Sequence, residues 1–170
     1  MESKYIVHIV YGSQTGNSEE IAHQLYERIL TNTYSHIASV DCKVLNEWTE
    51  TFTSQWSEEG AILIVICSTT GNGDAPDNAC HFWRKFKKRT LPKETLKNTQ
   101  FAVVGLGDSN YDKFCNMGKQ LNRRFTELSS KQVHELVCID EVMGLEEQIE
   151  PCLDNLIEMI QNVYTLDSPS

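Results

Sequence analysis

Short apolar runs recur along the chain, and each is bounded by polar residues. Three of them, Tyr5–Val10, Ala61–Cys67 and Phe101–Leu106, are apolar nearly throughout, which is typical of strands buried on both faces of a parallel sheet. Weaker patterns at Ile37–Leu45 and Val133–Ile139 predict two more strands. The sequence therefore predicts five strands.

Between the predicted strands, apolar residues recur at helical spacing. The residues expected to pack in the core are Ile21, Ala22, Leu25 and Ile29; Trp48, Phe52 and Trp56; Phe82, Trp83 and Phe86; Met117, Leu121, Phe125 and Leu128; and Ile149, Leu153, Leu156, Ile157 and Ile160. Asp77 or Asn78 is expected to cap the helix that carries the third group. Strands that alternate with helices predict a doubly wound parallel α/β sheet with helices on both faces.

Polar loops follow three of the predicted strands: the first loop (Gly12–Ser18), the second loop (Ser68–Asp77) and the third loop (Gly107–Cys115). In a doubly wound sheet, ligands bind beyond the carboxyl ends of the strands, where the strand order reverses. We therefore predict a ligand site where the three loops converge. The second loop has hydroxyls, glycines and carboxylates but little bulk, which lets its backbone approach a flat or phosphorylated ligand.

The first loop leads into a predicted helix and carries the hydroxyls of Ser13, Thr15 and Ser18. Free N–H groups at a helix start, together with such hydroxyls, form a site for a phosphate dianion. An ordinary capped helix explains this loop equally well when the loop is taken alone. The loop lacks the lysine of a P-loop and the glycine spacing of a dinucleotide fingerprint. A mononucleotide phosphate is therefore the preferred ligand.

The chain of 170 residues has 24 acidic and 15 basic residues, which gives a formal charge of -9 at pH 7. This charge repels nucleic acid and anionic membranes and suits a partner with a basic surface. We interpret the basic run Arg84–Arg89 as the solvated face of a helix. No apolar run approaches the roughly 18 to 20 residues of a membrane helix, and Met1–Lys4 does not resemble a signal peptide. We expect no nucleic-acid or membrane partner and a cytoplasmic location.

The cysteines show neither a CxxC motif nor histidines at metal-ligand spacing. We expect reduced thiols, most of them in or near the core, and no metal site. The six positions are Cys42, Cys67, Cys80, Cys115, Cys138 and Cys152. His8 lies inside an apolar strand, and we interpret it as a hydrogen-bonded structural residue.

Three motifs resemble those of the flavodoxin-like FMN domains of NADPH-dependent diflavin reductases. The first loop resembles the phosphate loop of that family and the second loop resembles its inner flavin loop. Gly105–Phe114 resembles its outer flavin loop. The motifs occur in the family's order and spacing, and the resemblance covers residues 4–163. This coverage makes the resemblance specific.

Two branches of the diflavin reductases remain open. Phe114–Lys119, Gly144–Glu146 and Glu150–Pro151 resemble methionine synthase reductase. Three other segments, Phe82–Arg84, Leu91–Pro92 and Phe101–Val103, resemble the cytosolic diflavin reductase that feeds iron–sulfur assembly just as closely. We lean toward the first branch.

The resemblance implies one FMN-binding domain over residues 1–165 with strand order 2-1-3-4-5, followed by a tail or linker at residues 166–170. It implies that the domain carries single electrons from an FAD/NADPH reductase module, in cis or in trans, to a redox acceptor protein with a basic docking surface. No catalytic acid or base is needed. The residues that would bind FMN are Ser13, Gln14, Thr15, Gly16, Asn17, Ser18, Ser68, Thr69, Thr70, Gly71, Asn72, Gly73, Leu106, Gly107, Asp108, Ser109, Asn110, Tyr111, Lys113, Phe114, Cys115, Asp140 and Val142.

The resemblance also implies individual roles. Ser13–Ser18 would bind the FMN phosphate, and Tyr111 would stack on one face of the flavin. Gly71 would lie near flavin N5, where freedom at positive φ lets its carbonyl turn toward an N5–H. Thr70 stands where the microsomal cytochrome reductases usually have tyrosine, so the inner flavin face lacks that aromatic. Val142 stands where some members have an acidic residue, so a flavin contact there is carried over with less support.

Acidic residues surround the expected flavin edge. They would steer a basic acceptor, or they only keep the chain in solution. This acidic rim consists of Asp74, Asp77, Asp108, Asp112, Asp140, Glu141, Glu146 and Glu147.

Other protein classes with this topology fit the sequence less well. A receiver domain needs an aspartate at the end of the third strand, where this chain has Cys67 and Ser68. A low-molecular-weight phosphatase needs a Cys-x5-Arg loop after the first strand. Two alternatives stay open: an interaction domain that keeps the fold without flavin, and a stand-alone flavodoxin-type carrier or quinone reductase.

Overall fold

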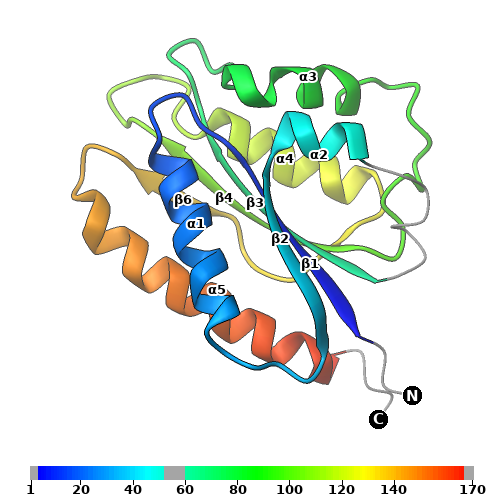
Figure 1. The fold of residues 1–170 in the computed structure, drawn as a ribbon. Coiled ribbons are helices and arrows are strands. Elements are labelled where there is room, and N and C mark those ends of the chain that lie inside the picture. Colours follow the sequence, from blue (N-terminus) through cyan, green and yellow to red (C-terminus); the bar gives the residue numbers. More distant parts are fainter. Residues whose placement is uncertain (1–3, 52–59, 167–170) are drawn as a thin grey trace.

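The computed structural model describes residues 4–51 and 60–166. Strands and helices follow one another in the order β1 (Tyr5–Gly12), α1 (Asn17–Leu30), β2 (Ile37–Val44), α2 (Leu45–Thr51), β3 (Ala61–Ser68), α3 (Asp77–Phe86), β4 (Gln100–Gly107), α4 (Asn116–Glu127), β5 (Lys131–Gln132), β6 (Val137–Asp140) and α5 (Leu145–Leu166) (Figure 1). The first four strands begin and end within two residues of their predicted bounds.

All strands belong to one parallel sheet with the order β2-β1-β3-β4-β5, and β6 also pairs with β4. The predicted doubly wound α/β fold and its strand order are confirmed. The buried residues of β1, β3 and β4 alternate between the two faces of the sheet, as the period of a strand requires.

The last predicted strand, Val133–Ile139, is wrong in its bounds. The chain pairs with β4 in two separate pieces, β5 and β6, and residues 133–136 belong to neither. Gln132 Nε2 donates to the carbonyl of His134 at 3.0 Å, and His134 Nδ1 lies 2.7 Å from the carbonyl oxygen of Glu135. Because side chains occupy these carbonyls, the strand is interrupted there.

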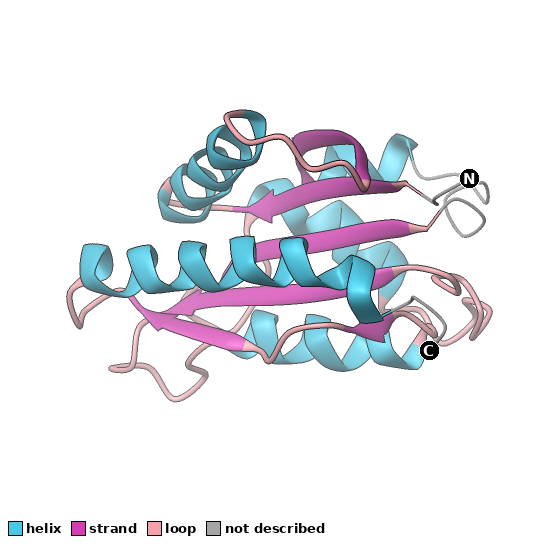
Figure 2. Ribbon diagram, turned by 90° about the horizontal axis from the view of Figure 1, so that it is seen from below, coloured by secondary structure: helices cyan, strands magenta, loops and turns pink. Residues whose placement is uncertain are grey.

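Helices cover both faces of the sheet. α1 and α5 pack on one face, and α2, α3 and α4 pack on the other (Figure 1). Figure 2 shows helices in front of and behind the strands. No helix in the described part of the chain is both long and apolar enough to cross a membrane.

The predicted core positions that lie within the described residues are buried, apart from Trp83 and Ile157, which are half-buried. Trp48 stacks on Phe86, with ring centroids 5.6 Å apart, under α2 and α3. Of the predicted aromatic group around Trp48, Phe52 and Trp56 lie outside the described residues.

The predicted cap of α3 is wrong. α3 follows Pro76 as its N-cap residue and has no side-chain cap at this end. Asn78 Oδ1 instead accepts the backbone N–H of Ser13 at 2.9 Å, and the N–H of Asp77 donates to Gln14 Oε1 at 3.1 Å. A local capping preference thus gives way to a contact between the first loop and α3.

His8 is hydrogen-bonded, as predicted: its Nδ1 lies 2.9 Å from Asp41 Oδ1 on the neighbouring strand. The cysteines described by the structure are free thiols. Five are buried or half-buried, and Cys80 is exposed on α3.

Candidate functional site

The carboxyl ends of β1, β3, β4 and β6 lie at one edge of the sheet because all their pairings are parallel. β1 lies between β2 and β3, so the chain passes from β1 to β2 on one side and then crosses to β3 on the other. This reversal is where ligands bind in doubly wound sheets. The structure brings the three predicted loops together at this edge and adds a fourth loop (Glu141–Gly144).

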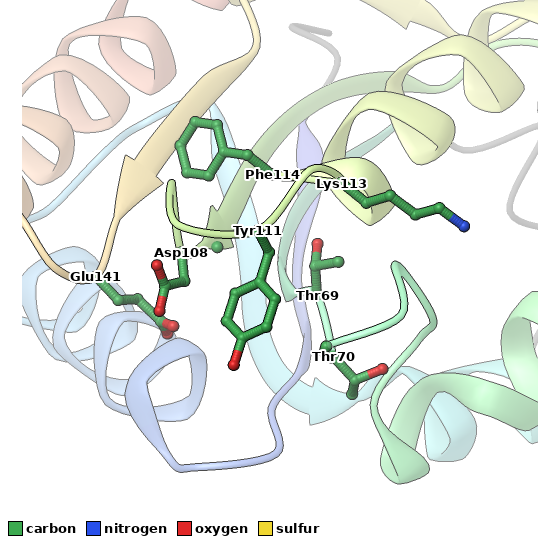
Figure 3. Close-up of a pocket in the computed structure, with 9 residues that line it drawn as sticks. Thr69, Thr70, Asp108, Tyr111, Lys113, Phe114 and Glu141 are labelled. Atoms are coloured by element: carbon green, nitrogen blue, oxygen red, sulfur yellow. The ribbon is translucent and has the colours of Figure 1, made fainter.

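A pocket opens between the second and third loops. Its lining residues are Thr69, Thr70, Gly71, Gly107, Asp108, Tyr111, Lys113, Phe114 and Glu141. Eight of these nine belong to the predicted set, and Glu141 is the addition. Figure 3 shows Tyr111 between Asp108 and Glu141 on one side and Thr69 and Thr70 on the other. The side chain of Tyr111 is 56% exposed, so its ring is available for stacking.

The second loop is a tight turn held by its own backbone. The N–H of Thr70 donates to the carbonyl of Asp74 at 2.9 Å, and the N–H of Gly73 donates to the carbonyl of Thr70 at 2.8 Å. Gly73 has a φ of 83°, in the region that favours glycine. Gly71 lies outside that region and has no atom within 4 Å of where a Cβ would stand. The tip of the turn is therefore open.

The second loop also holds the start of α4. Asn116 Nδ2 donates to the carbonyl of Gly73 at 2.7 Å, and the backbone N–H of Met117 donates to Thr69 Oγ1 at 3.2 Å. Thr69 thereby binds one of the N–H groups that a helix start leaves free. The two walls of the pocket are joined by these hydrogen bonds.

Asp140 positions the third loop. Its Oδ1 accepts the backbone N–H of Ser109 at 3.2 Å and that of Val142 at 3.3 Å. The hydrogen bond from the Ser109 side chain, followed by these backbone hydrogen bonds, lowers the pKa of the Asp140 carboxyl. Asp140 and Val142 do not line the pocket, whereas Glu141 does, and the N–H of Glu141 donates to the carbonyl of Gly107 at 2.8 Å.

The first loop ends at an uncapped helix start. Gly16 is the N-cap residue of α1, with a φ of 99° and no side-chain cap. Ser13 Oγ accepts the N–H of Gly16 at 2.9 Å, and Asn17 Nδ2 donates to Glu141 Oε1 at 3.1 Å, which ties this loop to the pocket. The Ser18 hydroxyl is buried and has no hydrogen-bond partner within the described residues. An uncapped helix start and a buried polar group without a partner fit a bound phosphate.

The remaining predicted site residues fall into two groups. Ser68, Leu106 and Cys115 are buried, so Leu106 and Cys115 could meet a ligand only through backbone groups. Asn72, Ser109 and Asn110 are exposed on the second and third loops.

The predicted set of FMN-binding residues omits three residues that build the site: Asn78, Asn116 and Glu141. Each acts through a contact with a distant part of the chain, which no local pattern reveals. The one signal in the sequence is position: Asn78 directly follows the second loop and Asn116 directly follows the third loop, where an asparagine side chain can bind loop backbone.

Charges are unevenly distributed around the site. No member of the acidic rim forms an ion pair within the described residues. The basic side chains of the run Arg84–Arg89 are exposed, as expected for a solvated surface, but α3 ends at Phe86, so only Arg84 and Lys85 lie on the helix and the other three follow it. On the α3 and α4 side, a basic groove is lined by Trp83, Lys87, Arg89, Asn116, Lys119, Gln120, Arg123, Arg124 and Glu127.

A doubly wound parallel sheet with polar loops gathered at its reversal point defines a class of α/β proteins that bind a nucleotide-like ligand at this edge. Comparison with known proteins then gives the family. The profile described as flavodoxin matches residues 9–153, and the chain belongs to the flavodoxin family. The family implies flavin binding and electron transfer.

The curated relatives are much longer proteins. Methionine synthase reductase from Bos taurus is 34% identical over 148 residues, which are 87% of this chain and 20% of that protein. NADPH-dependent diflavin oxidoreductase 1 from Bos taurus is 32% identical over 154 residues, or 89% of this chain and 24% of that protein. The chain thus spans about a fifth to a quarter of the length of these relatives, and the predicted resemblance to diflavin reductases is confirmed.

Solved flavodoxins have the same fold. The flavodoxin of Streptococcus pneumoniae TIGR4 superposes with a TM-score of 0.69 at 28% identity and covers 93% of this chain and 99% of its own. Oxidised flavodoxin 1 from Bacillus cereus also gives a TM-score of 0.69, over 94% of this chain and 99% of its own, at 22% identity. The second comparison supports the fold alone.

Proposed function

We propose that this chain is an FMN-dependent one-electron carrier, the FMN domain of an NADPH diflavin oxidoreductase. It accepts electrons from an FAD/NADPH reductase module, in cis or in trans, and passes them to a protein acceptor in the cytoplasm. One observation carries the proposal: the pocket around Tyr111 is tied through Asn17 and Glu141 to an uncapped helix start with a buried, unpartnered Ser18 hydroxyl. We assign residues 1–165 to this domain and residues 166–170 to a tail or linker; α5 itself extends to Leu166.

The residues at the site divide into a phosphate end and a ring end. Ser13–Ser18 hold the phosphate with backbone N–H groups, hydroxyls and the positive end of the α1 dipole, because this loop carries no Lys or Arg. Tyr111 offers its exposed ring to one flavin face. Thr69, Thr70 and Gly71 form the opposite wall with backbone and small side chains.

Bound FMN supplies the reversible gain and loss of single electrons. The chain's own residues bind and orient it. Asn116 and Thr69 fix the second loop to α4, and Asp140 fixes the third loop through Ser109. Gly71 at the open tip of the second loop is free to turn its carbonyl. No acid or base group is required for this task.

The surface beside the pocket suits a protein acceptor. Val142 is 46% exposed and Met143 is 69% exposed on the fourth loop, next to Glu141 of the pocket. The acidic rim has no ion-pair partner within the described residues, so its field is available to attract a basic surface. A small apolar centre inside a charged rim is typical of a docking surface.

A stand-alone flavodoxin-type carrier is the second candidate. It is favoured by the flavodoxin of Streptococcus pneumoniae TIGR4, since the superposition covers 99% of that chain at 28% identity. A flavin-free interaction domain is favoured only by Thr70, which leaves the second loop without an aromatic residue.

Electron delivery tests the proposal. The purified chain is incubated with FMN, freed of excess flavin, reduced with dithionite without oxygen and mixed with cytochrome c, a basic one-electron acceptor. We expect cytochrome c to be reduced in proportion to the bound FMN, and Tyr111→Ala to bind less FMN. A chain that binds FMN but leaves cytochrome c oxidised would contradict the carrier function. A chain that binds no FMN would favour the interaction domain.

A further inference from the structure

Two cysteines lie side by side where the third loop ends, and neither of them lines the pocket. Cys138 on β6 pairs in register with Gly105 on β4. A Cβ placed on Gly105 would stand 3.6 Å from the Cβ of Cys115, the N-cap residue of α4. Cys115 therefore lies over Gly105, which is the neighbour of Cys138 in the sheet. Because Gly105 has no side chain, there is room between the two thiols.

The strand direction points both thiols into the same space. Val137 and Ile139, the neighbours of Cys138, pack in the core under α1 and α5. Because side chains alternate along a strand, Cys138 faces the opposite side, which α4 covers. The Cys115 thiol donates to the carbonyl oxygen of Ile139 at 3.9 Å, and the Cys115 and Cys138 side chains are close enough to shift each other's pKa.

The two thiols differ in exposure and acidity. Cys138 is half-buried on an edge strand, whereas Cys115 is buried. The side-chain contact with Cys115, helped by the nearby Lys119 ammonium, lowers the pKa of Cys138, and the same contact together with burial raises the pKa of Cys115. Cys138 is thus the more accessible and the more readily ionised of the two thiols, and Cys115 is the adjacent resolving thiol.

We propose that Cys115 and Cys138 form a reversible dithiol that a hydroperoxide oxidises to a disulfide between β6 and the start of α4. With hydrogen peroxide, the Cys138 thiolate attacks one oxygen and the O–O bond breaks. Hydroxide leaves and takes up the proton that Cys138 had released, and Cys138 becomes a sulfenic acid. The sulfur of Cys115 then attacks that of Cys138, the S–O bond breaks, and the thiol proton leaves with hydroxide as water. Two thiols lose two electrons, and one peroxide becomes two waters.

The disulfide would join the end of the third loop to β6, the strand that carries Asp140. Cys115 ends the third loop, and Cys138 stands two residues before Asp140, which holds the same loop through Ser109. A covalent link here makes the open state of the loop less populated. We therefore expect slower release of FMN from the oxidised chain. This expectation rests on the proposed function, whereas formation of the disulfide does not depend on it.

Peptide mapping tests the dithiol directly. The chain is treated with hydrogen peroxide, its remaining thiols are blocked with N-ethylmaleimide, and it is cleaved with trypsin and Glu-C. Cleavage after Lys113 and Lys119 and after Glu135 and Glu141 separates the two cysteines from the other four. We expect residues 114–119 linked to residues 136–141, lighter by two hydrogens, and separated again by dithiothreitol. The proposal would be overturned if residues 114–119 and residues 136–141 were both recovered with N-ethylmaleimide on their cysteines, in a sample in which peroxide had oxidised Cys80.

Variants separate the dithiol from general oxidation. Cys138→Ser removes the attacking sulfur with a near-isosteric group and should abolish the linked peptide. Cys80→Ser removes an exposed thiol on α3 and should leave the linked peptide unchanged. A link that persists between residue 115 and any other cysteine in Cys138→Ser would contradict the pairing.

FMN release gives the second readout. We expect oxidation to slow release roughly threefold in the unaltered chain and in Cys80→Ser, and to have no effect in Cys138→Ser. Unchanged release from a chain that carries the link would overturn the coupling to the loop. A chain that binds no FMN would contradict the proposed function, and the linked peptide would still support the dithiol.

Discussion

Gly71 and Gly73 stand two residues apart in the second loop but differ in what surrounds them. At Gly73, an added Cβ would come within 2.6 Å of the Lys113 side chain and 3.0 Å of Asn116, and φ is 83°. At Gly71, nothing lies within 4 Å of that position. A glycine is needed at position 73 for the shape of the turn. A glycine is needed at position 71 only if the peptide group of Gly71 flips so that its carbonyl changes direction.

Alanine substitutions separate these two roles. We expect Gly73→Ala to lower the free energy of unfolding by about 1–3 kcal/mol, because both backbone strain and crowding oppose the new Cβ. Gly71→Ala should change it by less than about 0.5 kcal/mol and should shift the reduction potential of bound FMN. Urea denaturation and potentiometry provide the two measurements. Equal destabilisation by both variants would contradict this assignment.

Asp140 gives a pH dependence. Its pKa in the folded chain lies below the ordinary value of 3.8. Because the pKa of Asp140 is lower in the folded chain than in the unfolded chain, its hydrogen bonds stabilise the fold fully when the pH is above the unfolded pKa. This stabilisation is lost as the pH falls through the lower pKa of the folded chain. We expect carbon NMR to place this pKa below 3.8, and Ser109→Ala to raise it, because the hydroxyl donor is removed. An unshifted pKa in the unaltered chain would show that the carboxylate does not hold the third loop.

At the scale of elements, the start of α4 depends on a residue from another loop. Thr69 Oγ1 accepts the N–H of Met117, a long-range substitute for a local N-cap. We expect Thr69→Val, which keeps the shape and removes the acceptor, to lower the free energy of unfolding by about 1 kcal/mol. Hydrogen exchange at the Met117 amide should accelerate.

Thr70→Val is the matched control, because the Thr70 hydroxyl is exposed and bonds only within its own turn, to the carbonyl of Asp74. It should leave exchange at Met117 unchanged. Faster exchange at Met117 in both variants would mean that the turn as a whole, instead of Thr69, holds α4.

The pattern of apolar residues predicted most of the elements because burial decides them. β3 is buried at every position and matches its predicted range to one residue. The interrupted edge strand could not be predicted in the same way, because Gln132 and His134 engage backbone carbonyls that a ladder would use. The cap of α3 was wrong for a related reason: Asn78 contacts Ser13, which is 65 residues away in sequence.

The candidate site was predictable in its loops but not in its supporting contacts. Polar loops after buried strands are visible in sequence, and the parallel sheet brings them to one edge. Whether Asp140 or Glu141 lines the pocket depends on where β6 ends and how the following loop turns. The structure places Glu141 in the pocket and gives Asp140 to the third loop.

At the scale of the whole molecule, charge is divided between two regions. The chain carries a formal charge of -9, yet five cations line the basic groove between α3 and α4: Lys87, Arg89, Lys119, Arg123 and Arg124. The acidic rim lies around the pocket: half of it on the second, third and fourth loops (Asp74, Asp108, Asp112 and Glu141), and half at the ends of α3, β6 and α5 (Asp77, Asp140, Glu146 and Glu147). Such a division orients an approaching basic partner toward the pocket.

This orientation should depend on salt. We expect the rate of cytochrome c reduction to fall as ionic strength rises, because charges further apart than about 8 Å are screened at 0.15 M. Neutralising the rim with Glu146→Gln and Glu147→Gln should lower the rate at low salt, whereas Lys87→Gln and Arg89→Gln should not. A rate that is independent of ionic strength would show that the rim does not steer.

The central claim is that the chain holds FMN at the edge where its loops meet. Titrating FMN with the purified, flavin-free chain and following flavin fluorescence tests it most directly, with riboflavin as a control that lacks the phosphate. We predict that FMN fluorescence is quenched to a one-to-one end point, and that riboflavin and the Ser18→Ala variant both bind more weakly. FMN fluorescence that stays unquenched at a protein excess would contradict the account.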